Sequence, residues 1–460
     1  MFSNHRLCRW LAMILSICAI FSCSTASAFV DRADAPPYPE VLKISITRET
    51  WTATNGLTCE AAYPVTCLES VNKSLYSAQQ SLWEDLQAHA GEGSVMELEA
   101  TYRISGTKWA GFFLTGRILE LTDETSLEDK VPTTVYLNHA IFTYDMESGK
   151  ELKLEDVFPA DSQAWQEIAK LHKQRLLEYY PHLQKNLNDI DALCTYEVLK
   201  EQHFLPSAGR LLIVTPLEPI HENHWQLVHT IIPYYDFRQW MNEEAYVQTD
   251  NSHRPIVAFS YDDGPHDVHT LSILRTLNNY GASASFFCLG RSIEARPDIV
   301  RRELDYGHTV GNHTYKHKYE YQVSTDYLRE DRLQCLQIHR ELTGLAAKLF
   351  RAPGGNCDKY VEKEIGWPII LWCYSAGDTG NNNAYQLADR IYYGSKDGDI
   401  TLMHDIRQKT AKGSEMFLSR LAEDGFLFAT VDELLSLQGI TPQPNMVYRN
   451  AYPETDAVDE

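Results

Sequence analysis

Basic residues are scarce in this 460-residue chain, and no segment is rich in them. The sequence has 41 Lys and Arg residues against 63 Asp and Glu residues, a formal net charge of −22. A field of that sign repels phosphate backbones, and no local Lys/Arg-rich run offsets it. Nucleic acid is therefore not an expected partner.

Long apolar runs are also lacking. The apolar stretch at residues 11–21 is shorter than the roughly 20 residues that span a bilayer. It follows a start containing Arg6 and Arg9 and precedes a small-x-small site at residues 26–28, so residues 1–28 are predicted to be a signal peptide. Cys23 leaves a second option open, a lipoprotein signal with a lipid anchor. We expect export to the periplasm, cell envelope or extracellular space, with no transmembrane helix in the mature chain.

Paired-cysteine motifs are missing as well. No CxxC spacing occurs, which leaves a zinc ribbon unsupported. Beyond the signal peptide seven cysteines remain, an odd number, so at least one stays unpaired within the chain. Cys59 and Cys67 bracket Pro64 and are the predicted local disulfide.

The length favours two domains, because single cores stop growing at roughly 250–300 residues. Residues 40–246 predict a smaller α+β domain with an antiparallel sheet, starting from the alternation of Leu42, Ile44 and Ile46. In this region the sequence predicts a helix over 69–89, extended runs over 95–104, 109–121 and 133–144, a helix through 165–176, and strands near 211–214 and 225–232.

A polar, pattern-free linker is predicted at residues 247–254. From 255 to 440, apolar runs of four to six residues alternate with helical stretches, as at 256–260 and 284–288. That rhythm indicates an α/β fold, with βα units around a mainly parallel sheet or barrel. Residues 441–460 are predicted to be an acidic tail.

Two segments of the second half carry carboxylates and imidazoles at suggestive spacing. Asp262 and Asp263 follow a buried strand, so one can hold a metal while the other takes a proton; a turn that caps the next helix is the alternative. His313 and His317 stand at i and i+4, which brings both rings to one side of a helical turn. Two His and one carboxylate would leave positions open at a cation, as catalytic sites require.

Two later segments complete the pattern. In residues 350–355, glycines allow close backbone approach to a ligand, and Arg351 has the geometry to hold a carboxylate. His404 ends the apolar strand at 401–404, on the face where barrel enzymes carry catalytic groups.

In this order the four segments resemble the polysaccharide deacetylase family, the NodB homology domain of carbohydrate esterase family 4, over about residues 254–437. The resemblance implies a deformed (β/α) barrel and metal-dependent removal of N- or O-acetyl groups. It implies these roles: general base for Asp262, general acid for His404, a partner keeping Asp262 ionised for Arg351, and metal ligands for Asp263, His313 and His317. The predicted metal is Zn²⁺, with Co²⁺, Ni²⁺ or Fe²⁺ as alternatives.

The resemblance also implies substrate-binding residues: Gly354 through its N–H, Leu402 at the acetyl methyl, Trp372 on a sugar ring, and Asp378. The chain departs from the family at Gly354, where relatives carry an aromatic residue. In the fourth motif Ser375 and Thr379 replace an Asp and a Trp, which leaves Asp378 as the candidate to tune His404.

The order of elements over 40–246, with segments 149–158 and 232–235, resembles the extracytoplasmic module of PdaC-type deacetylases and RsiV-type anti-sigma factors. The expected function is an exported hydrolase that removes N-acetyl groups from N-acetylhexosamine residues of peptidoglycan. The alternatives are deacetylation of chitin, poly-N-acetylglucosamine or xylan, and a degenerate barrel in a glycan-binding or sensor protein.

Overall fold

The computed structural model describes residues 30, 32–52, 58–91, 94–120, 133–179, 187–216, 227–362 and 366–452. The predicted signal peptide at 1–28, the predicted anchor at Cys23 and the last residues of the predicted tail lie outside these ranges. Across the part described, no helix combines the length and apolarity needed to cross a membrane.

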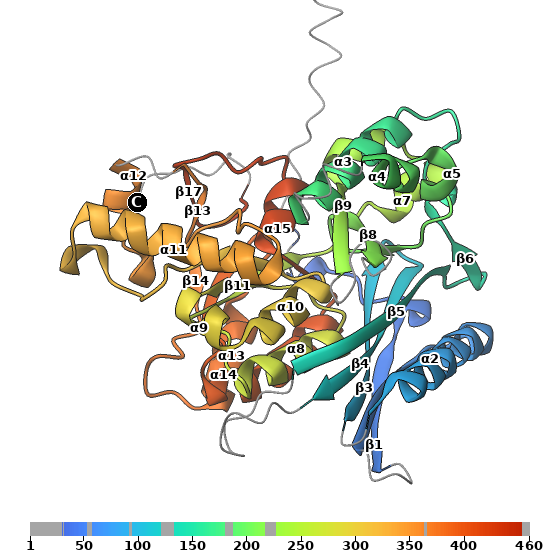
Figure 1. Cartoon of the computed structure of the whole chain (residues 1–460), viewed down its shortest axis with the longest axis horizontal. Helices are drawn as coiled ribbons and strands as arrows, with labels where there is room; N and C mark the ends of the chain where they lie inside the picture. Colours follow the sequence, from blue (N-terminus) through green and yellow to red (C-terminus); the bar gives the residue numbers. More distant parts are fainter. Residues whose placement is uncertain are drawn as a thin grey trace, which may run out of the picture.

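The N-terminal region forms one twisted sheet with a long helix on its outer side (Figure 1). In spatial and chain order its strands are β1 Ser45–Thr52, β2 Thr58–Val65, β3 Val95–Ser105, β4 Trp109–Glu120, β5 Thr133–Asp145 and β6 Lys150–Leu152. Helix α2, Glu69–His89, connects β2 to β3. Neighbouring strands are antiparallel except β2 and β3, which are parallel because the chain returns through α2 between them.

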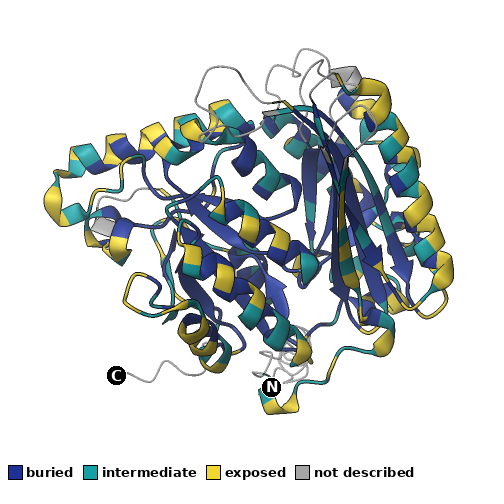
Figure 2. Cartoon of the chain, turned by 90° about the horizontal axis from the view of Figure 1, so that it is seen from below, coloured by how far each residue is buried: buried dark blue, intermediate teal, exposed yellow. Residues whose placement is uncertain are grey.

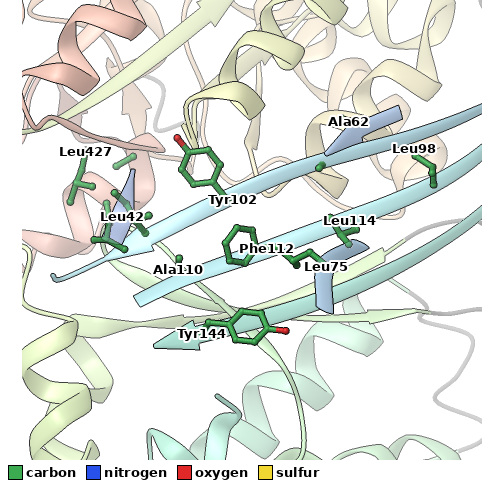
Figure 3. Close-up of a cluster of buried hydrophobic side chains, with 14 of the residues drawn as sticks. Leu42, Ala62, Leu75, Leu98, Tyr102, Ala110, Phe112, Leu114, Tyr144 and Leu427 are labelled. Atoms are coloured by element: carbon green, nitrogen blue, oxygen red, sulfur yellow. The ribbon is translucent and has the colours of Figure 1, made fainter. Parts of the chain in front are cut away.

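The core of this region lies between α2 and the sheet. Helix α2 buries Val71, Leu75, Leu82 and Leu86, a helical spacing that faces one side. Figure 3 shows Leu75 beside Leu114 of the sheet, and Leu427 of the C-terminal region near Leu42. The same apolar cluster therefore reaches from the first sheet into the second half of the chain.

A smaller layer follows, which consists of one long helix, several short helices and a three-stranded antiparallel sheet. Its elements are α3 Ala164–Tyr179, α4 Leu187–Leu193, α5 Tyr196–Leu199, β7 Phe204–Pro206, β8 Arg210–Pro216, β9 Leu227–Pro233, α6 Tyr234–Phe237 and α7 Glu243–Gln248. Across the whole chain, Figure 2 shows that most strand residues are buried and that the helices carry exposed residues on their outward faces.

The C-terminal region is a parallel βα arrangement. Its strands are β10 Ile256–Asp262, β11 Ser285–Cys288, β12 Thr309–Asn312, β13 Ile369–Ile370, β14 Tyr374–Ser375, β15 Ile400–His404, β16 Leu427–Ala429 and β17 Val447–Tyr448. Its helices are α8 His269–Asn279, α9 Gly290–Ala295, α10 Pro297–Asp305, α11 Thr325–Thr343, α12 Asp358–Glu362, α13 Ala384–Gly394, α14 Gln408–Glu423 and α15 Val431–Leu437.

The strands follow the order of a deformed barrel, with no continuous ladder closing the ring among the described residues. Parallel pairing runs β14-β15-β10-β11-β12, and isolated bridges continue it through Phe350 to β13. Residues 371–373 then lead from β13 directly into β14, and Cys373 N–H donates to Ile400 O of β15 at 3.1 Å. Between β13 and β14 the structure therefore shows a chain connection and not a strand ladder. The expected α/β fold with a deformed (β/α) barrel and a preceding α+β region is confirmed.

Buried ion pairs join the first sheet to the barrel helix α10. Arg302 Nη1 lies 2.9 Å from Glu97 Oε2, and Arg117 Nη2 lies 3.1 Å from Asp305 Oδ2. Removing one partner of such a pair costs about 3–5 kcal/mol, because the other charge stays buried. The sheet is therefore firmly held against the barrel.

The segment predicted as a linker packs against the first sheet. Asn251 is buried, accepts from Gly106 N–H at 2.9 Å, and donates to Ala208 O at 2.7 Å. The predicted domain boundaries themselves stay predictions. Up to Tyr452, the segment predicted as an acidic tail is ordered against the barrel and includes strand β17. Within it Leu371 N–H donates to Tyr448 O at 2.8 Å, a backbone contact that the acidic composition does not reveal.

The predicted disulfide between Cys59 and Cys67 is wrong. Cys67 is an exposed free thiol. Cys59 lies at the start of strand β2 and Cys67 just beyond its end. A strand rises about 3.3 Å per residue, whereas a disulfide needs Cα atoms within about 7 Å.

Candidate active site and metal centre

Strands β10 and β15 bring the predicted acid and base together. Both end at the same edge of the barrel, and Asp262 is paired in register with His404. Residues in register on parallel neighbours point to the same face, as do residues two apart. Leu402, in register with Ser260, therefore shares the face of Asp262 and His404, while Tyr261 and Met403 belong to an apolar cluster on the other face.

The three predicted metal ligands converge. Asp263 Oδ1 lies 3.6 Å from His313 Nε2 and 3.4 Å from His317 Nε2. Donor atoms about 2.0–2.2 Å from a tetrahedral cation stand roughly 3.3–3.6 Å from one another. Among the described residues this is the one His/Cys/Asp/Glu group with the spacing of a metal site.

The hydrogen bonds around the triad leave its ligand atoms available. His313 Nδ1 lies 2.9 Å from Arg351 O, a backbone acceptor, so Nδ1 carries the proton and Nε2 presents its lone pair. Asp263 Oδ1 is buried without a hydrogen-bond partner. An orphaned carboxylate oxygen facing two imidazole nitrogens fits a divalent cation.

The helical turn expected at His313 and His317 is wrong. Both histidines lie in an irregular loop after β12, not in a helix. Thr314 has φ of 67° and His317 has φ of 56°, values in the left-handed region, and Asp263 has φ of 79°. Such backbone is rare outside glycine and is concentrated at functional sites. In the described chain Asn445 is the one other non-glycine residue with positive φ.

Arg351 holds Asp262 as predicted. Its Nη1 lies 2.7 Å from Asp262 Oδ1, and its Nε and Nη2 donate to the carbonyl oxygens of Ile370 and Leu371 at 3.0 and 3.1 Å. The guanidinium is fully buried and lies 4.0 Å from the centre of the Phe287 ring. Asp262 Oδ2 is directed toward the triad, 3.6 Å from His313 Nε2.

Asp378 lies directly beside His404. Its Oδ1 lies 2.9 Å from His404 Nδ1, and its Oδ2 accepts from His404 N–H at 2.6 Å and from Thr410 Oγ1 at 2.8 Å. Asp378 is 2% exposed, and both oxygens of its carboxylate are engaged in these hydrogen bonds. In this structure the Asp378 carboxylate faces the His404 imidazole, and the substrate-binding role predicted for Asp378 stays a prediction.

The charges around His404 favour its protonated form. Burial acts to lower the pKa of His404, but the hydrogen bond to Asp378 and the charges of Asp378, Asp262 and Asp263 outweigh it and raise the pKa to about 9. Burial acts to raise the pKa of Asp378, but its hydrogen bonds with His404 and Thr410 hold it below its usual value. The balance of these effects favours a protonated imidazole at His404.

The remaining predicted residues surround this group. Leu402 is buried, while Trp372 is half-buried with its ring centre 5.7 Å from the Arg351 guanidinium. Gly354 has φ of 66° in the short turn Pro353–Gly355. Sequence reasoning missed Thr410, the second donor to Asp378. Its only sequence signal is its place in the first turn of α14, shortly after His404.

The comparisons with known proteins concern mainly the second half of the chain. A family model described as polysaccharide deacetylase matches residues 249–366. The peptidoglycan-N-acetylglucosamine deacetylase PgdA of Listeria monocytogenes is 36% identical over 178 residues, which are 39% of this chain and 38% of that protein's length. A peptidoglycan-N-acetylglucosamine deacetylase of Bacillus cereus is 33% identical over 188 residues, which are 39% of this chain and 88% of the relative.

The chain belongs to the polysaccharide deacetylase family. Among solved structures, the peptidoglycan deacetylase PdaC of Bacillus subtilis is similar, with 26% identity and a TM-score of 0.40, over 40% of this chain and 92% of that one. In this member of the family the family model ends before Trp372, Asp378, Leu402 and His404. The placement of those four side chains is known from the structure. The likeness of residues 40–246 to a PdaC/RsiV module stays a prediction.

Proposed function

We propose that this protein is an exported, metal-dependent hydrolase that removes N-acetyl groups from N-acetylhexosamine residues in peptidoglycan. The observation that carries the proposal is the convergence of Asp263, His313 and His317 beside Asp262 and His404. Relatives named as peptidoglycan deacetylases support the substrate class, and a wall substrate together with the predicted signal peptide supports export.

The residues suggest how the amide is cleaved. Asp263, His313 and His317 would hold the cation, which when bound polarises the acetyl carbonyl as a Lewis acid. Asp262 Oδ1 is occupied by Arg351, so Oδ2 is the oxygen left to take the proton of the attacking water.

His404 would act on the leaving group. Its Nδ1 is bonded to Asp378, so its Nε2–H is the donor left for the departing amine nitrogen. An amine leaves poorly unless it is protonated, which is why a raised His404 pKa serves the reaction. The Gly354 N–H would donate to the carbonyl oxygen as negative charge develops there, and Leu402 would contact the acetyl methyl.

Acetate release tests the proposal. Purified full-length protein with Zn²⁺ is expected to release acetate from peptidoglycan sacculi, with chitin oligomers, poly-N-acetylglucosamine and acetylated xylan measured in parallel. Asp262→Asn and His404→Ala should each lower the rate by about 10²–10⁴-fold while the bound metal stays equimolar. Asp236→Asn, an exposed carboxylate on α6, is the matched control. Normal rates in Asp262→Asn would refute the assigned chemistry.

The substrate panel separates the alternatives. A preference for xylan or for a linear N-acetylglucosamine polymer would replace peptidoglycan as substrate. Bound metal without turnover on any acetylated glycan would favour a degenerate glycan-binding protein. The presence of all three predicted metal ligands together with Asp262 and His404 argues against that alternative.

A further inference from the structure

Two stacked tyrosines stand beside the metal triad. The rings of Tyr319 and Tyr321 lie 5.4 Å apart between centroids, with an interplanar angle of 8°. Tyr319 also contacts the predicted ligand His317 edge-on, with centroids 5.3 Å apart. Tyr321 is 70% exposed. The catalytic roles assigned above use neither ring.

Tyr319 lies against the glycine turn at 353–355. A Cβ added at Gly354 would lie 2.6 Å from Tyr319 Cε1, and one added at Gly355 would lie 2.9 Å from Trp372 Cη2. Both glycines also have positive φ. Because neither carries a side chain, one aromatic ring packs on each side of this turn, and Tyr319 fills the space that a side chain at 354 would need.

The backbone under the tyrosines is fixed from two sides. Lys359 of α12 donates through Nζ to Glu320 O at 2.6 Å and to Val323 O at 3.3 Å, and its N–H donates to Glu320 Oε2 at 3.0 Å. Gln322 accepts from Tyr319 N–H at 3.1 Å. Hydrogen bonds therefore hold in place the turn at residues 319–323, which carries the two rings.

We propose that Tyr319 and Tyr321 form a glycan-binding subsite, in which a pyranose ring of the acetylated chain stacks on the tyrosine face next to the reacting sugar. This proposal rests on the proposed function. The C–H groups of one pyranose face are apolar and slightly positive, which suits the negative face of an aromatic ring. Tyr321, stacked on Tyr319 and largely exposed, would thus present the aromatic surface that Gly354 does not provide.

Kinetics of the full-length, zinc-loaded protein on chitin tetraose test the subsite. Stacking that is equal in the ground and transition states affects KM alone, so Tyr321→Ala is expected to raise KM about tenfold with kcat within about twofold. Tyr319→Ala should act in the same direction, and Tyr319→Phe and Tyr321→Phe should keep the wild-type KM because the ring is retained. Tyr76→Ala, an exposed tyrosine on α2, is the matched control.

Zinc content and thermal unfolding are measured for each variant, because Tyr319 touches His317. If Tyr319→Ala loses zinc, the Tyr321 variants and Tyr319→Phe decide the question. Unchanged KM in Tyr321→Ala, with acetate still released, would overturn the subsite and leave the proposed function standing.

A direct binding measurement tests the subsite when the proposed hydrolase function fails. If the wild type releases no acetate, titration calorimetry with chitin tetraose still measures affinity. Weaker binding by Tyr321→Ala would then support the subsite without the hydrolase function. Equal binding by both proteins, or no binding by the wild type, would overturn it.

Discussion

Replacing Asp378 by Asn removes the negative charge that faces His404 and changes little in side-chain size. In the wild type the pKa of His404 is raised to about 9, although burial acts to lower it, mainly through the hydrogen bond and charge of Asp378. Without that charge we expect the pKa to fall toward the ordinary value of about 6.5.

The magnitude follows from the fraction of protonated imidazole. At pH 8 a group with a pKa of about 9 is roughly nine-tenths protonated, whereas one with a pKa of about 6.5 is roughly one-thirtieth protonated. If His404 must be protonated, Asp378→Asn should lose about 30-fold in kcat/KM at pH 8 and little at pH 6.

The assay is the pH profile of acetate release between pH 5 and pH 10. The alkaline limb of the wild type should fall as pH rises through about 9, and that of Asp378→Asn about 2.5 pH units lower. Asp389→Asn, which removes a largely exposed carboxylate on α13, should keep the wild-type limb. Coincident alkaline limbs in wild type and Asp378→Asn would refute the assignment of His404 as the acid.

Three further outcomes test other contacts. His317→Ala should lose bound zinc, measured by mass spectrometry of the metal, whereas Asp262→Asn should keep it; retained zinc in His317→Ala would contradict the triad. Arg351→Met should lower the free energy of unfolding, measured in urea, by about 3–5 kcal/mol, because Asp262 would stay buried without its partner; a loss below about 1 kcal/mol would contradict this. Cys67 should react with iodoacetamide in the native, unreduced protein, and protection of its thiol would restore the disulfide with Cys59.

Much of the secondary structure could be predicted from periodicity. The helix expected over 69–89 is α2, and the runs expected over 95–104 and 109–121 match β3 and β4 within a residue. These elements have one face against the core, so their hydrophobic pattern is strong. The parallel pairing of β2 with β3 had no such signal, because pairing partners are set by where α2 returns the chain.

The sequence predicted which residues form the site better than it predicted the geometry of that site. The spacing of His313 and His317 suits a helical turn and also suits a loop with left-handed residues, and the loop is what forms. Asp378 was predicted as a site residue from its motif. Its hydrogen bond with His404 forms only because residues 374–378 lie beside β15 in the folded chain. The sequence around Tyr319 did not predict its contact with Gly354, because the two residues are 35 positions apart in the chain.

The amino-acid sequence by itself determined which groups are available to hold a cation and move protons, because the residue types and their order along the barrel strands are local information. Only the tertiary structure decided which oxygen of Asp262 stays open, which carboxylate supports His404, and which aromatic rings border the glycine turn. Those outcomes depend on distances between side chains far apart in the chain, and such distances are fixed by packing.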